Sequence, residues 1–336
     1  MPASSVMYRT FVIANPCAGA GVVKEEWSLV ERLLRANLSE LDYAFTQGPG
    51  HATLLAREAL RAGWEMIVAI GGDGTLNEVV NGFYEVPDVD KAYTRDAEGW
   101  IIPQDTTPTP INPDAVIGLV PLGTGGDFRR TLGLMGGVTE SIEHLRGRDT
   151  CPVDLGQIGF IDHSGKLASR YFVNIAAAGL SGLVDKHVNS TWKGLGGRTS
   201  FVWATLRAFS QWRNVEVQVR LDDTVEITTP MQNLVVANGA YFGAGMWIAP
   251  GARVDDGEFQ VVLMGDLSVP ESLKVLPQVF KGTHLSSRNI SRQSARRVSA
   301  RVTDSAREFL LDIDGEAPGG LPATWHLHPG ALKFKF

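Results

Sequence analysis

Three glycine-rich loops, each preceded by a short apolar run, are the feature that most constrains the fold of this chain. The loops read NPCAGAG at 15–21, GGDGTLN at 71–77 and PLGTGGDF at 121–128. Glycine gives up side-chain contacts and backbone order, so a chain keeps it at this density where bare backbone is needed. The preceding runs have the length and apolar character of buried strands, at 10–14, 65–70 and 115–121.

Amphipathic runs separate these strands in the first part of the chain. Apolar residues recur there with the three- and four-residue spacing of helices, at 24–38, 52–63 and 75–83, and a further strand is expected at 41–46. Strands that alternate with helices pair in parallel through right-handed crossovers. We therefore predict a doubly wound α/β nucleotide-binding domain over residues 1–150. Residues 85–114, rich in proline, threonine and aspartate, are predicted to be a surface insertion in it.

The character of the sequence changes near residue 150. Most runs after that point are β-type and follow one another without intervening helices, which is typical of an antiparallel sandwich. The expected helical exceptions are 199–212 and 269–280. We therefore predict a β-rich C-terminal domain over 151–336, so that the fold class is α/β plus β.

The three loops predict an anion site. A strand that ends in glycines and opens into a helix exposes unpaired backbone N–H groups at the positive end of a helix dipole, where phosphate commonly binds. A single loop of this kind can be a simple connection. Three loops at the carboxyl ends of parallel strands converge on one edge of the sheet, where open α/β folds bind ligands. Together they favour a polyphosphate ligand.

Two common phosphate-binding patterns are absent from the sequence. No GxxxxGK[ST] string occurs, and GxGxxG fails because Gly19 and Gly21 are followed by Lys24 where the third glycine should fall. Hydride-transfer chemistry on a dinucleotide is therefore disfavoured.

Composition limits the binding partners and the cellular compartment that we expect for this protein. The net charge of −6 over 336 residues argues against a general nucleic-acid binder, and two cysteines indicate a reducing compartment rather than a disulfide framework. The sequence shows neither a secretion signal nor an uninterrupted apolar stretch of about 20 residues. We expect a soluble cytoplasmic protein that binds no nucleic acid.

The strings GGDGTLNEVVNG and PLGTGGDF, with an NP upstream and a DGE downstream, occur here in the order found in one enzyme family. The chain resembles the diacylglycerol kinase catalytic-domain family of lipid kinases, which includes bacterial diacylglycerol kinases and the sphingosine and ceramide kinases. The resemblance runs from Asn15 to the C-terminus. GGDGT alone also occurs in NAD kinases, whereas PLGTGGDF, VDDGEF and DGE separate the lipid kinases from them.

The resemblance implies an ATP site, with Mg²⁺ at its phosphates. The implied ATP-site residues are Asn15, Pro16, Gly19, Thr46, Gly71, Gly72, Asp73, Gly74, Thr75, Leu76, Asn77, Gly123 and Thr124. Asp73 would lie beside the phosphates and their Mg²⁺, and Asp127 would act near the same centre. The family usually has asparagine at the position of Gly126, so a contact made by that amide is lost in this chain.

The resemblance also implies residues in the C-terminal domain. Asp256 would be a metal ligand, together with the backbone carbonyls of Arg253 and Glu258. Glu316 would be the general base, supported by Asp314. The chemistry is consistent with these roles, since phosphoryl transfer needs positioning, a divalent cation and an acceptor hydroxyl whose proton can leave.

Other interpretations of these residues remain open at this point. Asp255–Asp256–Gly257 is also a good hairpin turn, and His326 and His328, which share one face of an expected strand, are more readily surface residues than metal ligands.

The leading interpretation is an ATP- and Mg²⁺-dependent lipid kinase. Its acceptor lies in a membrane, so we expect peripheral contact with the inner face of the membrane, and the lipid hydroxyl is expected in a cleft between the two domains. The alternatives are an NAD kinase and a catalytically weak nucleotide- or lipid-binding regulator. The sequence identifies neither the acceptor lipid nor whether the protein is a monomer or a homodimer.

Overall fold

The computed structural model describes residues 7–190, 207–208, 211–304 and 306–336, so most of the helix predicted at 199–212 lies outside the described residues. The chain divides into two compact units. Unit 1 comprises Met1–Val86, Pro108–Asp154 and Gly330–Phe336, and unit 2 comprises Pro87–Thr107 and Leu155–Pro329. The two predicted domains differ from these units in three segments: 87–107 belong to unit 2, and 151–154 and 330–336 belong to unit 1.

Unit 1 is built on a parallel sheet. Its strand order is β2 (Glu40–Phe45), β1 (Arg9–Ala14), β3 (Met66–Gly71) and β6 (Val116–Pro121). The end of β17 (Gly319–Lys335) adds a further parallel pairing, because Phe334 lies opposite Ile117 of β6. This pairing is the physical reason that the last residues of the chain belong to unit 1.

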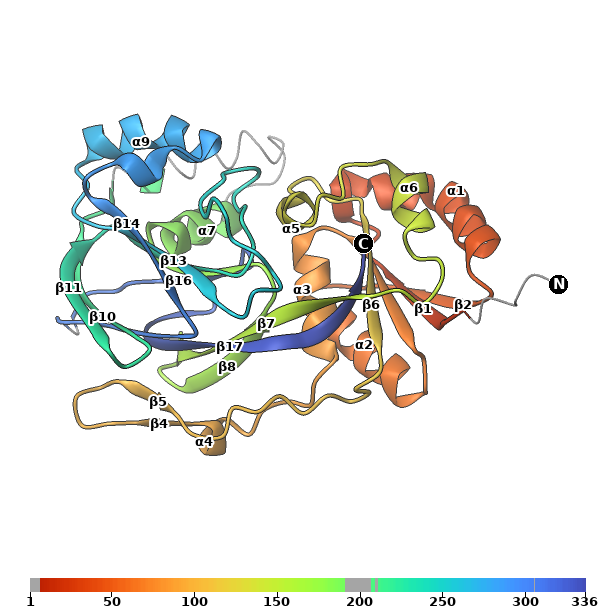
Figure 1. Ribbon diagram of the computed structural model, residues 1–336, viewed down its shortest axis with the longest axis horizontal. Coiled ribbons are helices and arrows are strands. Elements are labelled where there is room, and N and C mark those ends of the chain that lie inside the picture. The colour runs from red at the N-terminus through yellow and green to blue at the C-terminus, as the bar shows by residue number, and fades with distance from the viewer. Residues whose placement is uncertain (1–6, 191–206, 209–210, 305) are drawn as a thin grey trace. The chain divides into compact units, whose positions relative to one another are not determined.

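Helices cover both faces of this sheet. The apolar face of α1 (Val22–Asn37) and residues of α6 (Val138–Glu143) share one buried cluster with alternate residues of β1, β3 and β6. On the other face, α2 (His51–Arg61) contacts α3 (Asp73–Gly82), and both contact the sheet (Figure 1). The predicted doubly wound α/β architecture is therefore confirmed, with helix and strand ends within a few residues of those expected.

A carboxylate on α3 fixes the start of α2. The Glu78 carboxylate accepts the backbone N–H of Gly50 at 2.8 Å and that of Ala52 at 3.0 Å. The first N–H groups of a helix have no partner within the helix, so this side chain replaces a local cap.

Unit 2 consists of two antiparallel sheets. One has the order β14 (Ile290–Ala295), β13 (Phe259–Met264), β12 (Asn233–Ala237), β9 (Ile175–Gly179) and β16 (Leu311–Ile313). The other has β11 (Val225–Met231), β10 (Val215–Leu221), β15 (Arg297–Val302) and β17, which also pairs with β7 (Cys151–Asp162), itself paired with β8 (Leu167–Phe172). Inward residues of both sheets, such as Val217, Leu234, Val261 and Trp325, form one core. This confirms the predicted C-terminal β-sandwich.

Two helices accompany the five-stranded sheet of unit 2 (Figure 1). They are α7 (Leu180–Ser190), which follows β9 directly, and α9 (Val269–Lys281), which packs Val275 and Val279 on the sheet. Ser268 and Glu271 form a capping box at the start of α9. In the part of the chain that the structure describes, no helix is long and apolar enough to cross a membrane.

The segment predicted to be a surface insertion carries its own structure. It contains a short helix, α4 (Val89–Ala92), and a hairpin of β4 (Tyr93–Arg95) and β5 (Ile101–Pro103). Trp100 is fully buried between the guanidinium groups of Arg220 and Arg301, whose Cζ atoms lie 4.0 and 4.8 Å from its ring centre. Contacts such as these accompany the assignment of residues 87–107 to unit 2 rather than to the N-terminal domain in which the insertion was predicted.

The expected surface position of the two histidines on β17 is wrong. His326 and His328 both hydrogen-bond through Nε2 to the Oε1 atom of Gln157, at 3.1 and 2.9 Å. The Gln157 amide is oriented by a further bond from its Nε2 to Ser169, so both histidines are donors. Burial lowers the pKa of His326 to about 3 and that of His328 to about 4. They are neutral members of a buried polar network.

Candidate functional site

The three glycine loops of unit 1 follow neighbouring strands of the parallel sheet, as predicted. They begin after Ala14 of β1, Gly71 of β3 and Pro121 of β6. Carboxyl ends of parallel strands meet at one edge, and the backbone joins them further: the Asn15 N–H bonds to the Ile70 carbonyl and the Leu122 N–H to the Gly71 carbonyl. Thr46, after β2, joins the same edge through its N–H to the Ala14 carbonyl.

The glycines of these loops, which have no side chain, allow the loop backbones to pack closely against one another. A Cβ on Gly123 would lie 2.3 Å from the Cα of Gly72, and a Cβ on Gly19 would lie 2.4 Å from the carbonyl oxygen of Leu122. Both contacts are with backbone, which cannot move aside as a flexible side chain can. The glycines are therefore needed for close packing of the loops, and the edge presents mainly backbone groups.

Polar side chains connect the first two loops. Asn15 donates from Nδ2 to Thr75 Oγ1 at 3.1 Å, and its Oδ1 accepts the N–H of Cys17 at 3.0 Å. Both of its polar ends are thus used to fix the turn after β1 against the start of α3.

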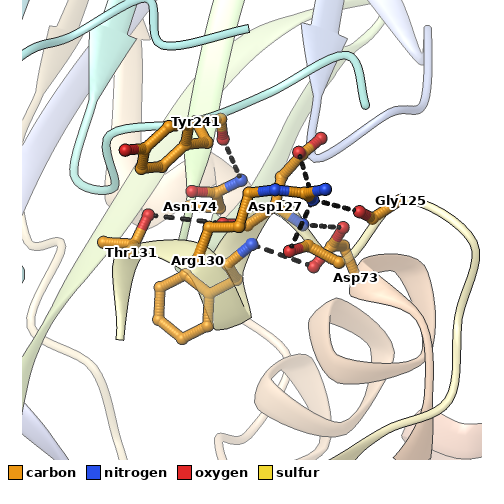
Figure 2. A network of polar contacts seen from close by, with 9 residues as sticks. Asp73, Gly125, Asp127, Arg130, Thr131, Asn174 and Tyr241 are labelled. Carbon is orange, nitrogen blue, oxygen red and sulfur yellow. Dashed lines mark hydrogen bonds and ion pairs between the residues drawn. The ribbon is translucent and has the colours of Figure 1, made fainter. Parts of the chain in front are cut away.

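Asp73 connects the second loop to the third. Its Oδ2 accepts the backbone N–H of Asp127 at 2.9 Å and its Oδ1 accepts that of Phe128 at 3.1 Å (Figure 2). These are the first N–H groups of α5 (Asp127–Thr131). Asp73 therefore has a structural role, capping the start of α5, that the sequence did not reveal. Its predicted role beside the phosphates remains a prediction.

Gly125 lies beside both predicted carboxylates of this edge. A Cβ on Gly125 would lie 3.3 Å from Asp73 Oδ2 and 4.0 Å from Asp127 Oδ2. The bare Cα thus leaves room between two carboxylate oxygens, the ligand type that Mg²⁺ prefers. This donor set fits a magnesium ion that keeps several of its waters.

The predicted ATP-site residues differ in exposure, and Gly71, Thr75, Leu76 and Asn77 are buried. Leu76 and Asn77 are buried within α3, whereas Gly74 and Thr124 are exposed at the edge. The side chains of Leu76 and Asn77 therefore support the edge from beneath.

In unit 2, the predicted base Glu316 follows β16. Its Oε2 pairs with Nη1 of Arg170 on β8 at 2.5 Å, and the Glu316 side chain is 46% exposed. Asp314, with its backbone in the left-handed region at φ 48°, accepts the N–H groups of Val173 at 3.2 Å and Ile175 at 2.9 Å. Asp314 thus fixes the turn that carries Glu316, in keeping with its predicted supporting role.

Sequence reasoning missed a buried pair of carboxyl groups beside this turn, Asp312 on β16 and Asp185 on α7. Burial, followed by the neighbouring Asp312 carboxylate, raises the pKa of Asp185 well above its usual value, and Glu316 adds to the rise. Burial also raises the pKa of Asp312. The pair is best described as sharing a proton. The alternation of acids in LDIDGE was the available signal for Asp312; nothing in the sequence connects Asp185 to it.

The predicted metal ligands of unit 2 lie in one turn before β13. Asp256 Oδ1 accepts the N–H of Glu258 at 3.2 Å, and the Arg253 guanidinium pairs with Asp255 at 3.1 Å. Within the described residues, no group of three or more histidine, cysteine or acidic side chains is placed to hold a metal ion. The predicted set depends on backbone carbonyls and remains a prediction.

Known proteins match almost the whole chain. Residues 9–158 match the diacylglycerol kinase catalytic domain, and residues 174–335 match the YegS C-terminal NAD kinase beta sandwich-like domain. A diacylglycerol kinase of Bacillus subtilis (strain 168) is 28% identical over 333 residues, covering 96% of each chain. One of Staphylococcus carnosus (strain TM300) is 28% identical over 318 residues, covering 94% of this chain and 91% of the relative.

A solved structure has the same fold. The crystal structure of a putative diacylglycerol kinase from Bacillus anthracis str. Sterne aligns with a TM-score of 0.72 over 98% of both chains, at 20% identity.

Fold and matching domains together define a nucleotide-dependent phosphotransferase. Residues 9–158 match a diacylglycerol kinase catalytic domain, and the comparisons support a lipid kinase that uses ATP. The predicted resemblance is confirmed, and the lipid-kinase interpretation is favoured over the NAD kinase alternative.

Proposed function

We propose that this lipid kinase phosphorylates diacylglycerol, with Mg²⁺ at the phosphates of ATP. The acceptor is taken from the relatives that match nearly the full chain, which are named diacylglycerol kinases. The single observation that carries the ATP side of the proposal is the edge of unit 1, where three glycine loops pack backbone against backbone. Exposed N–H groups at such an edge suit phosphate oxygens.

In the proposed reaction, the acceptor hydroxyl oxygen forms a bond to the γ-phosphorus as the bond from that phosphorus to the β–γ bridging oxygen breaks, and ADP leaves. The hydroxyl proton passes to the Glu316 carboxylate. Partial exposure of the Glu316 side chain supports this role, because an accessible carboxylate can accept a proton, and the pairing with Arg170 would orient it.

Asp73 and Asp127 would hold Mg²⁺ beside Gly125. When bound, the ion would offset negative charge on the phosphate oxygens. In the same proposal Asp73 keeps its bonds to the start of α5, so the metal and the third glycine loop are positioned by one side chain. We retain Asp256 with the carbonyls of Arg253 and Glu258 as a second, structural metal position.

We further propose peripheral contact with the cytoplasmic face of a membrane, where a lipid acceptor and ATP are both accessible. The phosphorylated product would return to phospholipid biosynthesis. No nucleic acid is involved, and the net charge of −6 accords with that.

The outer face of α9 supports the membrane proposal. Val269, Leu273 and Phe280 are 41%, 46% and 49% exposed. At about 100° per residue they fall within about 40° of one another around the helix axis. Lys274 and Lys281 flank this stripe on one side. An apolar stripe bordered by lysines is suited to the interface of an anionic bilayer.

An acceptor panel tests the proposal. Purified protein is incubated with γ-labelled ATP and Mg²⁺, and separately with diacylglycerol, sphingosine, ceramide and phosphatidylglycerol in mixed vesicles, and with NAD in solution. We expect label in diacylglycerol, and its loss when EDTA removes the divalent ion. Label in NAD alone, or transfer to a sphingoid base in preference to diacylglycerol, would contradict the proposed acceptor.

A further inference from the structure

Arg129, on α5 directly after the third glycine loop, has a side chain that folds back over Gly126, which has no side chain. Gly126, which precedes α5, has φ 60° and ψ 42°, in the left-handed region that favours glycine. A Cβ built on Gly126 would lie 2.6 Å from Nε of Arg129 and 3.0 Å from its Cδ. The bare Cα of Gly126 therefore leaves the space in which the Arg129 side chain lies.

The guanidinium of Arg129 lacks the partners that its neighbour has. Arg130 donates to the carbonyls of Gly125 and Gly126 at 2.5 and 3.2 Å and pairs with Asp127 at 3.5 Å (Figure 2). The Nε atom of Arg129 is buried and has no hydrogen-bond partner. Two successive arginines at one loop thus differ: Arg130 fixes the loop, and Arg129 is left with an unused donor.

An unused buried donor on a cation is unfavourable unless a ligand supplies the acceptor. Arg129 lies on α5, which directly follows the loop whose Gly123 packs on Gly72 at the edge assigned above to the phosphates of ATP. Phosphate oxygens are well matched to a guanidinium, whose Nε and Nη donors form a planar fork that binds two oxygens at once.

We propose that Arg129 is a phosphate-binding residue of the nucleotide site, and that Gly126 is bare so that the arginine can take this position. The inference rests on the proposed location of ATP at the glycine edge. It assigns to this chain a cationic contact where the family resemblance leads one to expect an asparagine amide.

Calorimetric titration of the full chain with ATP and with AMP, without lipid, tests the assignment. Arg129→Ala should weaken ATP binding by about tenfold or more, and AMP binding by less than about twofold, because AMP lacks the β- and γ-phosphates. Arg129→Lys should bind ATP with an affinity between those of the wild type and Arg129→Ala. The control is Arg35→Ala, which removes an exposed arginine of the same unit that pairs with Glu31; it should bind ATP as the wild type does.

Two further readouts separate ligand binding from packing. Because the Arg129 Nε has no partner in the free protein, Arg129→Ala should leave the melting temperature unchanged. Gly126→Ala should weaken ATP binding as Arg129→Ala does, since the new methyl group displaces the arginine, and the double variant should be no weaker than either single variant.

Unchanged ATP affinity in Arg129→Ala would overturn the inference. So would an equal loss of ATP and AMP binding with a lowered melting temperature, which would make Arg129 a packing residue. The proposed function fails differently, since a wild-type protein that binds no ATP would contradict the glycine edge itself.

Discussion

Units 1 and 2 carry their functional groups in different ways. In unit 1 the candidate site is an edge of backbone, brought together by glycines such as Gly123, which could not accept even a methyl group. In unit 2 the predicted base and its support are side chains held by other groups: Glu316 by Arg170, and Asp314 by the backbone N–H groups of Val173 and Ile175.

This difference predicts how each unit responds to substitution. A site made of backbone fails when a side chain is added, because the loops must separate. A site made of side chains fails when a functional group is removed while the backbone stays as it was. Variants of the two units should therefore differ in kind, and they are taken in order of decreasing expected effect.

The largest effect is expected at Glu316. Glu316→Gln keeps the size of the side chain and its acceptor toward Arg170 but removes the base, so turnover should fall by about 10²–10⁴-fold. The matched control is Glu226→Gln, which changes an equally exposed carboxylate of unit 2 paired with Arg220. Steady-state rates of lipid phosphorylation measure both. Near-wild-type turnover in Glu316→Gln would remove Glu316 from the role of base.

Gly123 is the sharpest test of the backbone site. Gly123→Ala places a methyl group against the Cα of Gly72, so the loops must move apart, and ATP affinity should fall by about 100-fold. The free energy of unfolding should also fall by about 1–3 kcal/mol. Gly137→Ala is the control, since this glycine of unit 1 is outside the predicted ATP-site residues and its Cβ meets nothing within 4 Å. If both variants bind ATP equally well, close packing of these loops is not what forms the site.

The membrane proposal predicts an intermediate effect. Leu273→Glu combined with Phe280→Glu puts two charges on the exposed apolar stripe of α9, and binding to phosphatidylglycerol-containing vesicles should weaken by about tenfold or more. Leu54→Glu, at an exposed leucine on α2 of unit 1, should have no effect. Vesicle sedimentation measures both, and equal binding by all proteins would exclude α9 as the contact.

The last prediction concerns how the free energy of unfolding depends on pH. The pKa values of His326 and His328 are about 3 and about 4 in the folded protein, against about 6.5 unfolded. The unfolded chain therefore takes up more protons below pH 6.5. The free energy of unfolding should fall toward pH 4, by up to about 1.4 kcal/mol per pH unit for each histidine.

His328→Asn should remove about half of this slope. The raised pKa of the Asp185–Asp312 pair acts in the opposite sense, because the folded state then holds the extra proton, but it is common to both proteins. Urea unfolding at pH 7 and pH 5 supplies the comparison. Identical slopes in the wild type and the variant would show that His328 takes up its proton as readily in the folded state as in the unfolded chain.

Much of unit 1 was predictable from sequence, because its strands, helices and glycine loops are local patterns. The loop after EMIVAI is placed at the sheet edge by its local pattern alone. The sequence could not show which atoms of these loops contact one another. That Asp73 caps α5 depends on a contact between segments more than fifty residues apart. That Gly126 makes room for Arg129 depends on the direction of the arginine side chain.

Unit 2 was predictable in class and much less so in detail. Its strands alternate well enough to indicate a sandwich, but alternation does not say which polar residues end up inside. His326 and His328 read as surface residues because their partner, Gln157, is on another strand. Trp100 read as part of a surface segment because the arginines that enclose it come from β10 and β15.

The central claim is that unit 1 binds the nucleotide through backbone while unit 2 supplies the base. The most direct test is the ATP dissociation constant of Glu316→Gln, measured by calorimetry beside that of Gly123→Ala. We expect affinity within about twofold of wild type for Glu316→Gln and a loss of about 100-fold for Gly123→Ala. Loss of ATP affinity in Glu316→Gln, together with wild-type affinity in Gly123→Ala, would contradict the claim.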